Sequence, residues 1–177
     1  MSTGSNPAAR HIPLCVDMDG TLLRTDTLHE SLLAMVRQDP WALFQLPLWL
    51  LRGKAAFKQE VAQRGKLDPA LLPVHGDFLT WLREQKRGGR ELILVTAADA
   101  KIAESVAEHY EIFDRVLASE GEANLSGERK RERLVQIFGE NGYDYAGNES
   151  ADLAVWRSAR EAIVVSGNSR LVRRAGT

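Results

Sequence analysis

Short apolar runs that end in a polar residue recur along the chain and alternate with stretches of helical periodicity. The first run, at 12–17, ends at Asp17, and the second, at 91–96, ends at Thr96. Weaker runs of the same kind lie at 115–119, 143–147 and 162–166. Short runs that are apolar on both faces are typical of buried parallel strands. The pattern therefore predicts a parallel sheet that presents polar side chains at the carboxyl ends of its strands.

Helical patterns separate these runs. The stretch at 100–110 carries apolar residues on one face behind Asp99, which we read as its N-cap. A second stretch, at 128–138, stops at Gly139, and Ser150 can cap a third at 151–160. Alternating strands and helices predict an α/β fold with a mostly parallel sheet and helices on both of its faces.

Residues 24–75 interrupt this alternation. They contain no clear strand and three helical stretches, at 27–37, 41–51 and 54–64, before a helix at 76–87 leads back to Gly88-Gly89. We predict an all-helical insert at 24–75 after the first strand, set into a core formed by 11–23 and 76–177. Residues 1–10 are small and polar and predict a flexible tail.

Composition excludes several classes of function. The chain has 177 residues, enough for one compact domain, and its 23 Lys plus Arg nearly balance 24 Asp plus Glu, so nothing predicts nucleic-acid binding. The single cysteine, Cys15, excludes an internal disulfide and fits a cytoplasmic setting. The longest apolar run, 41–51, is interrupted by Gln45 and Pro47 and falls short of the roughly 20 residues that span a bilayer.

Two acids two residues apart, Asp17 and Asp19, follow the first predicted strand, and Gly20 permits a turn there. Asp17 is expected to point into the crevice where α/β sheets bind ligands. One such carboxylate can attack phosphorus while the other gives or takes a proton. The two carboxylates also repel each other, and a divalent cation relieves that repulsion while it neutralises phosphate charge.

Four segments, in order along about 12–170, resemble the motifs of the haloacid dehalogenase (HAD) superfamily. Asp-Met-Asp-Gly-Thr resembles the first motif, Val-Thr-Ala the second, a lysine near a helix start the third, and Gly-Asn-Glu-Ser-Ala-Asp the fourth. The matching residues are Asp17, Asp19, Thr96, Lys130, Asn148 and Asp152. The resemblance implies a Rossmann-like HAD core, with a helical cap inserted after the first strand.

The same resemblance implies a Mg²⁺-dependent phosphate monoester hydrolase. Asp17 would form an aspartyl-phosphate, and Asp19 would act as acid and then base. Thr96, Lys130 and the backbone amides of Ala97 and Ala98 would hold the phosphoryl group. Asp17, the Asp19 carbonyl, and Asn148 or Asp152 would bind Mg²⁺, directly or through water.

The fourth motif departs from the family pattern, because Asn148 stands where an acid is usual. An amide carbonyl can still coordinate Mg²⁺, but one negative charge is lost. Glu149 and Asp144 are nearby acids that a shift of register would be needed to use.

A narrower resemblance concerns 19–31, 94–99, 124–127 and 145–156. These stretches are similar to the HAD domain that precedes UbiA-type prenyltransferases in bacterial fusion proteins, where Asn148 would be a habit of the subgroup. That resemblance implies a prenyl or lipid-linked phosphate as substrate, a membrane prenyltransferase as partner, and a place in the cytoplasm at the membrane surface. The run 41–51, with Trp41 and Trp49, then has two readings: the core of the insert, or an exposed patch that touches a membrane or a prenyl chain.

Three other functions remain open at this stage. A HAD-like phosphotransferase or mutase would have the same motifs and differ only in its products. A dehalogenase releases halide, which needs no proton when it leaves, so the second acid, Asp19, argues against this function. A non-catalytic module that docks on a membrane partner is suggested by Asn148 and by the run 41–51.

Overall fold

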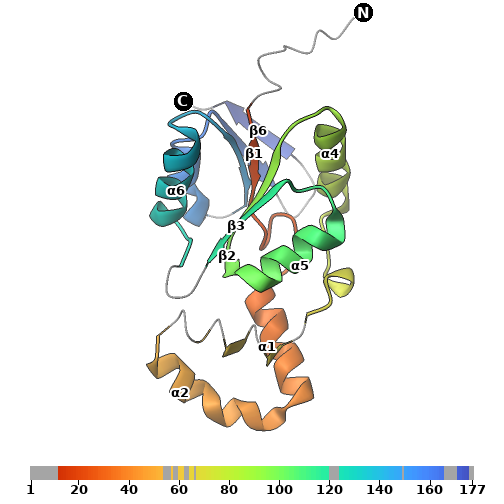
Figure 1. Ribbon diagram of the computed structural model, residues 1–177, viewed down its shortest axis with the longest axis vertical. Helices are drawn as coiled ribbons and strands as arrows, with labels where there is room; N and C mark the ends of the chain where they lie inside the picture. Colours follow the sequence, from red (N-terminus) through yellow and green to blue (C-terminus); the bar gives the residue numbers. More distant parts are fainter. Residues whose placement is uncertain are drawn as a thin grey trace, which may run out of the picture.

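The computed structural model describes residues 12–53, 57, 60–61, 64–65, 67–119, 124–148, 150–165 and 171–175. The predicted tail at 1–10 and most of the predicted helix at 54–64 lie outside these ranges. The described elements form an α/β fold around one six-stranded sheet, with an all-helical segment beyond one edge of it (Figure 1).

The sheet has the order β3-β2-β1-β4-β5-β6. Strands β1 to β5 are parallel, and β6 pairs antiparallel with β5. The bounds of the strands are Leu14–Val16 for β1, Leu92–Asp99 for β2, Arg115–Ser119 for β3, Asp144–Gly147 for β4, Glu161–Val165 for β5 and Leu171–Ala175 for β6. The five predicted strands are therefore confirmed, while β6 was not predicted and β2 runs three residues beyond Thr96.

Successive residues of the central strands pack into two separate hydrophobic clusters, one on each face of the sheet. Leu14 and Val16 belong to the cluster that also contains residues of α4 (Gly76–Arg87) and α5 (Ala100–Tyr110). Cys15 lies in the other cluster, with residues of α6 (Glu128–Phe138) and α7 (Leu153–Trp156). This alternation follows from the two-residue period of a strand, and it places helices on both faces as predicted.

The predicted helices at 76–87, 100–110 and 128–138 have the bounds of α4, α5 and α6. The Asp99 carboxylate accepts from the Lys101 N–H at 3.0 Å, which confirms Asp99 as the N-cap of α5.

The prediction of one helix at 151–160 behind Ser150 was wrong. Residues Ser150–Asp152 form a short 3₁₀ helix, η4, and α7 ends at Trp156. The Ser158 hydroxyl donates to the Val155 carbonyl at 3.1 Å and lies 2.7 Å from the Tyr143 hydroxyl. These local bonds compete with continuation of the helix.

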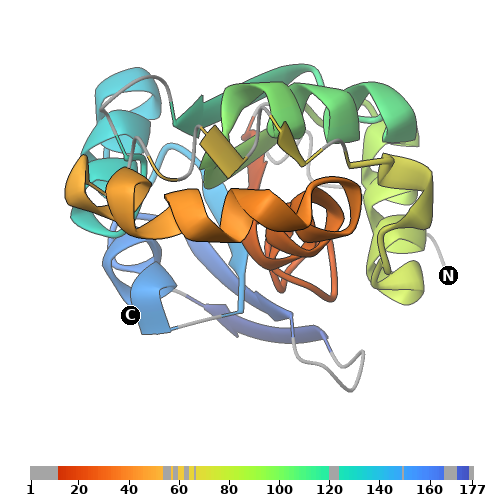
Figure 2. The ribbon, with the colours of Figure 1, turned by 90° about the horizontal axis from the view of Figure 1, so that it is seen from below.

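Between β1 and α4 the described chain holds helices and no named strand. Helix α1 (Thr27–Gln38) is followed by the 3₁₀ helix η2 (Pro40–Gln45), by α2 (Leu46–Leu51) and later by the short η3 (Pro69–Leu71). The predicted helix at 41–51 is thus divided in two, at the position where Pro47 removes a backbone donor. Figure 2, from below, shows α1 and α2 lying across the carboxyl-terminal edge of the sheet.

The two connections between this helical segment and the sheet lie against each other. The Arg24 N–H donates to the Pro73 carbonyl at 2.8 Å, and the His75 N–H donates to the Leu22 carbonyl at 3.0 Å. The segment therefore leaves and returns through one narrow, hydrogen-bonded neck. Its division from the core at residues 24 and 75 is the boundary that we propose.

The helical segment has a small hydrophobic cluster of its own. Met35, Ala42 and Trp49 are buried there, and the guanidinium of Arg64 lies 4.9 Å from the centre of the Trp49 ring. Trp41, in the same stretch of chain, is 74% exposed. Trp49 therefore belongs to the core of the insert, so the suggestion that it lies in an exposed patch was wrong, whereas Trp41 is exposed.

We predict that Trp49→Ala lowers the free energy of unfolding by about 3–5 kcal/mol, because it removes the largest side chain of this cluster. The matched variant Trp41→Ala should change it by less than about 0.5 kcal/mol, since it is a surface substitution. Urea denaturation, followed by circular dichroism, measures both. Equal effects of the two substitutions would contradict this account of the cluster.

Candidate active site

The residues singled out in the sequence lie around one cavity at the carboxyl ends of the strands. The cavity has a volume of about 220 Å³. Its lining includes all six predicted catalytic and phosphate-binding residues and one of the two predicted metal ligands of the fourth motif: Asp17, Asp19, Thr96, Ala97, Ala98, Lys130 and Asp152. Residues of α1 and α5 line the opposite wall. The topology therefore brings together side chains that are up to 135 positions apart in sequence.

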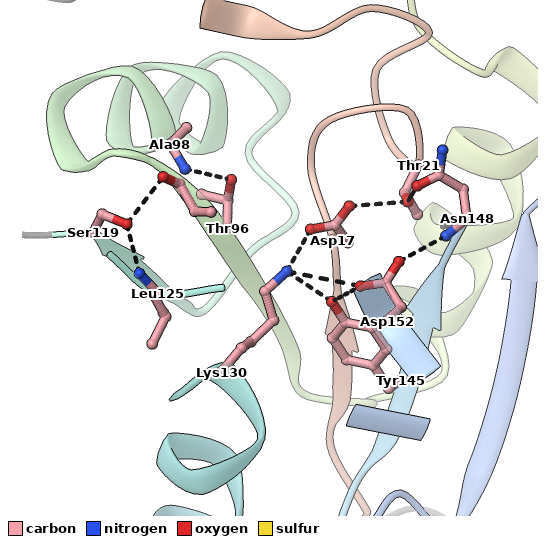
Figure 3. Close-up of polar contacts among 11 residues, drawn as sticks. Asp17, Thr21, Thr96, Ala98, Ser119, Leu125, Lys130, Tyr145, Asn148 and Asp152 are labelled. Carbon is pink, nitrogen blue, oxygen red and sulfur yellow. Dashed lines mark hydrogen bonds and ion pairs between the residues drawn. The ribbon is translucent and has the colours of Figure 1, made fainter. Parts of the chain in front are cut away.

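A buried ion pair between Asp17 and Lys130 lies at the floor of this cavity (Figure 3). Asp17 directly follows β1, and Lys130 projects from the first turn of α6, with its Nζ 2.7 Å from Asp17 Oδ1. Burial raises the pKa of the Asp17 carboxyl to about 6, Lys130 opposes that shift, and the nearby carboxylate of Asp152 adds to it. Lys130 thus favours the ionised form that a nucleophilic carboxylate requires.

Tyr145 completes this cluster and was not singled out from the sequence. It lies on β4 and is fully buried, and its hydroxyl accepts from Lys130 Nζ at 2.9 Å and donates to Asp152 Oδ1 at 2.8 Å. Burial, together with the negative charges of Asp17 and Asp152, raises the pKa of Tyr145 well above its usual value. The phenol therefore stays protonated and joins the two charged side chains.

Asp152 faces inward from η4, and both of its carboxylate oxygens accept hydrogen bonds. Oδ1 accepts from Tyr145 and lies 3.9 Å from Lys130 Nζ, and Oδ2 accepts from the Asn148 N–H at 3.0 Å. Gly147 allows this approach, because a Cβ there would meet the Asp152 carboxylate. Asp152 is therefore placed to orient Lys130 and Asn148.

Asn148 directs its side-chain carbonyl toward Asp17. The Thr21 hydroxyl lies 3.1 Å from Asn148 Oδ1 and 3.2 Å from Asp17 Oδ2, so both of these oxygens face the Thr21 hydroxyl. Gly20 has a φ of 73°, and a Cβ at this position would collide with the Asn148 amide. The glycine therefore permits both the turn after Asp19 and the close approach of Asn148.

This donor set fits Mg²⁺, which prefers oxygen ligands from carboxylates and carbonyls. Within the described ranges, no three His, Cys, Asp or Glu side chains gather to hold a metal ion. The set would combine the carboxylate of Asp17 with the amide oxygen of Asn148. It would carry one negative charge fewer than a site with an acid at position 148. Asp144, weighed above as a substitute acid, cannot serve, because it is buried in ion pairs with Arg90 and Arg160 at the amino end of β4. Glu149 lies outside the described residues.

Asp19 lies in the turn after β1 and is held by the start of α1. Its Oδ1 accepts from the Thr27 N–H at 2.8 Å. Burial raises the pKa of the Asp19 carboxyl, although the hydrogen bond from Thr27 opposes that shift. A raised pKa suits a group that must donate a proton and later accept one.

Thr96 and the residues after it form the wall beside Asp17. The buried Thr96 hydroxyl accepts from the Ala98 N–H at 3.0 Å, so its own hydrogen can be donated to a phosphoryl oxygen. The resemblance assigns the Ala98 N–H to the phosphate, but in the structure this N–H donates to Thr96. The Ala97 carbonyl accepts from Ser119, whose hydroxyl also accepts from the Leu125 N–H (Figure 3).

Comparisons with known proteins give a relative of similar sequence and several structures of similar fold. No protein-family model matches the chain. An uncharacterized protein of Sinorhizobium fredii (strain NBRC 101917 / NGR234), y4nM, is 38% identical over 157 residues, which are 88% of this chain and 30% of that protein. The chain therefore spans less than a third of the length of this curated relative.

Among solved structures, CbbY of Rhodobacter sphaeroides in complex with phosphate has a TM-score of 0.60 at 19% identity, over 88% of this chain and 86% of that one. A phospho-aspartyl intermediate analogue of phosphoserine phosphatase has a TM-score of 0.55 at 14% identity, over 86% and 85%. The HAD family hydrolase t0658 of Salmonella enterica serovar Typhi has a TM-score of 0.58 at 14% identity, over 84% and 61%. Likeness at these identities establishes the fold.

We predict that Tyr145→Phe lowers kcat for an aryl phosphate, the substrate class of the function proposed below, by about tenfold to a hundredfold, because a buried lysine and a buried carboxylate each lose a hydrogen-bond partner. Steady-state kinetics and thermal denaturation of the variant measure the two consequences.

Tyr143→Phe is the matched control. Tyr143 is also buried, but its hydroxyl bonds to Ser158 and to the Val155 carbonyl and lies outside the cavity lining. This variant should lose stability without the loss of kcat. A Tyr145→Phe enzyme with unchanged kcat would show that the phenol does not position Lys130.

Proposed function

We propose that this chain is a HAD-type phosphatase that cleaves phosphate monoesters through an aspartyl-phosphate. The proposal is supported by the fold, which is that of the HAD hydrolases, with a HAD-like Rossmann-type core. The observation that carries the proposal is the buried Asp17–Lys130 pair at the carboxyl end of β1. An ionised carboxylate at the floor of a cavity, beside a cation, can attack a phosphoryl group.

In the proposed first step, an oxygen of Asp17 forms a bond to phosphorus while the bond between phosphorus and the ester oxygen breaks. Asp19 donates its proton to the departing alcohol. In the second step, Asp19 takes a proton from water, the water oxygen bonds to phosphorus, and the Asp17 carboxylate leaves. Lys130 and the Thr96 hydroxyl stabilise the charge on the phosphoryl oxygens throughout.

Mg²⁺ is part of the proposal, with Asp17 and Asn148 as the side chains that would hold it and Asp152 as a partner through water. The ion, when bound, would neutralise phosphoryl charge as a Lewis acid. The oxygen donors that converge beside Thr21 support this assignment. Asn148 leaves the protein with fewer negative charges at this point, which favours a weaker metal site.

We predict that Asp17→Asn lowers Mg²⁺-dependent hydrolysis of p-nitrophenyl phosphate by about a thousandfold or more, because the nucleophile is removed. Removal of Mg²⁺ with a chelator should also abolish turnover by the parent chain. Asp68→Asn is the control, since Asp68 caps η3 outside the cavity. Turnover that survives in Asp17→Asn would contradict the proposal.

Two alternatives give different results in the same assay. A phosphotransferase or mutase would move the phosphoryl group to a second alcohol rather than to water, so less free phosphate than nitrophenol would appear. A non-catalytic docking module would show no turnover at all.

A specific surface supports the finer proposal that this phosphatase works at a membrane on a prenyl or lipid-linked phosphate. Trp41, Phe44 and Leu51 are 74%, 77% and 85% exposed on η2 and α2, and the rings of Trp41 and Phe44 stack 5.7 Å apart. Arg37 is in the last turn of α1, shortly before Trp41 in the chain, and Arg52 directly follows Leu51 as the C-cap of α2. Exposed aromatic and leucine side chains next to arginines are typical of surfaces that bind anionic bilayers.

No helix in the described part of the chain is both long and apolar enough to cross a bilayer. We propose that the exposed side chains of η2 and α2 make the contact. A membrane prenyltransferase beside this surface, as the narrower sequence resemblance implies, is the partner that we propose.

We predict that the protein co-sediments with vesicles of phosphatidylethanolamine and phosphatidylglycerol. The triple variant Trp41→Ser/Phe44→Ser/Leu51→Ser should lose this binding, because the apolar contact with the bilayer is lost. Leu71→Ser is the control, since Leu71 is 81% exposed on η3, outside the η2–α2 surface. Absence of vesicle binding by the parent chain, or equal binding by the triple variant, would overturn the membrane contact.

A further inference from the structure

The described lining of the cavity has more acidic than basic side chains, and this excess bears on the charge of the substrate. Among the described lining residues, Lys130 is the only lysine, arginine or histidine. Four aspartates besides Asp17 line the same cavity: Asp19, Asp26, Asp99 and Asp152. The phosphoryl group of a substrate has Lys130, Thr96 and the proposed Mg²⁺ to receive it, so the question is what receives the rest of the molecule.

Lys130 has no spare charge for a second anion. Its Nζ lies 2.7 Å from Asp17 Oδ1, 2.9 Å from the Tyr145 hydroxyl and 3.9 Å from Asp152 Oδ1. Both carboxylates are buried, and Lys130 is buried with them. Its positive charge is therefore already shared between two acids at the floor of the cavity.

The opposite wall carries the carboxylates of Asp26 and Asp99, which are fixed by the helices that they cap. Asp26 Oδ1 accepts from the Leu28 N–H at 2.8 Å, at the start of α1. Asp99 Oδ1 accepts from the Lys101 N–H at 3.0 Å, at the start of α5. A helix N-terminus contributes about half of a positive charge, so a full carboxylate on each leaves this wall negative.

The histidine next to this wall is not part of the cavity lining. His29 Nδ1 lies 3.8 Å from Asp26 Oδ2, and its side chain is 76% exposed. On α1 the described lining between the two caps adds the apolar Leu28 and the hydroxyl residues Thr27 and Ser31, and on the side of α5 it adds the apolar Ala98 and Ile102. A carboxylate or second phosphate placed there would be repelled by the carboxylates of Asp26 and Asp99.

We propose that the cavity selects phosphate monoesters whose alcohol part carries no negative charge. This inference rests on the phosphatase function proposed above and deepens it. Asp26 and Asp99 are its specificity-determining residues: they exclude anionic alcohols, while an uncharged or ammonium-bearing alcohol is accepted against the apolar wall. The cavity volume of about 220 Å³ admits the phosphoryl group and a few carbon atoms, and a longer chain would extend past the mouth.

Three substrates of similar size test the proposal: n-propyl phosphate, O-phosphoethanolamine and phosphoglycolate, with p-nitrophenyl phosphate as a reference for activity. The expected kcat/KM for phosphoglycolate is lower than for the other two by about tenfold or more. A phosphoglycolate kcat/KM equal to or above that of propyl phosphate would overturn the selection. Loss of all turnover, the reference included, would instead overturn the phosphatase function and this inference with it.

The double variant Asp26→Asn/Asp99→Asn locates the effect. Asparagine is as good an N-cap as aspartate, so α1 and α5 are expected to keep their starts. The ratio of kcat/KM for phosphoglycolate to that for propyl phosphate should rise by about tenfold. Asp39→Asn, at the cap of η2 outside the cavity, should leave this ratio unchanged. An unchanged ratio in the double variant would show that these two carboxylates do not determine the specificity.

Discussion

The ion pair between Asp17 and Lys130 is the contact on which the site depends. Both side chains are buried, and each would be costly in this position without the other. The pair joins the end of β1 to the first turn of α6, two elements that are more than a hundred residues apart in the chain. The site therefore exists only when α6 is docked beside the end of β1.

The other polar groups extend this pair into a connected network. Tyr145 bonds to Lys130 and to Asp152, Asp152 bonds to the backbone of Asn148, and Asn148 meets Asp17 through Thr21. A buried network of this kind is favourable only when every member has a partner. The asparagine at 148 leaves one lysine against two buried carboxylates, a smaller negative excess than a third acid would give. This balance is consistent with the weaker metal site proposed above.

Much of this arrangement could be predicted from the sequence. Asp17 and Thr96 follow apolar runs, and the carboxyl ends of parallel strands meet at one edge of a sheet, so their convergence follows from the pattern. The bounds of α5 were predictable because Asp99 begins the helix and its apolar face has a regular period. Asp26 caps α1 in the same way and also lines the cavity, as its place shortly after the first motif allowed.

The residues that could not be predicted depend on tertiary contacts. Tyr145 stands within a strand and has the appearance of a core residue until α6 brings Lys130 to its hydroxyl. The run 41–51 is apolar on both sides of Gln45, so only the packing of α1 against η2 and α2 separates the buried Trp49 from the exposed Trp41. Strand β6 was missed because its sequence, Leu-Val-Arg-Arg-Ala, lacks the pattern of a strand that is buried on both faces.

Chemical trapping of the covalent intermediate tests the central claim most directly. The protein is mixed with an aryl phosphate and Mg²⁺, quenched in acid during turnover and reduced with borohydride, which converts an aspartyl-phosphate to homoserine. Peptide mass spectrometry is predicted to find homoserine at position 17, and at no other aspartate, in the parent chain. Turnover without a modified residue 17, or modification of a different carboxylate, would contradict the account.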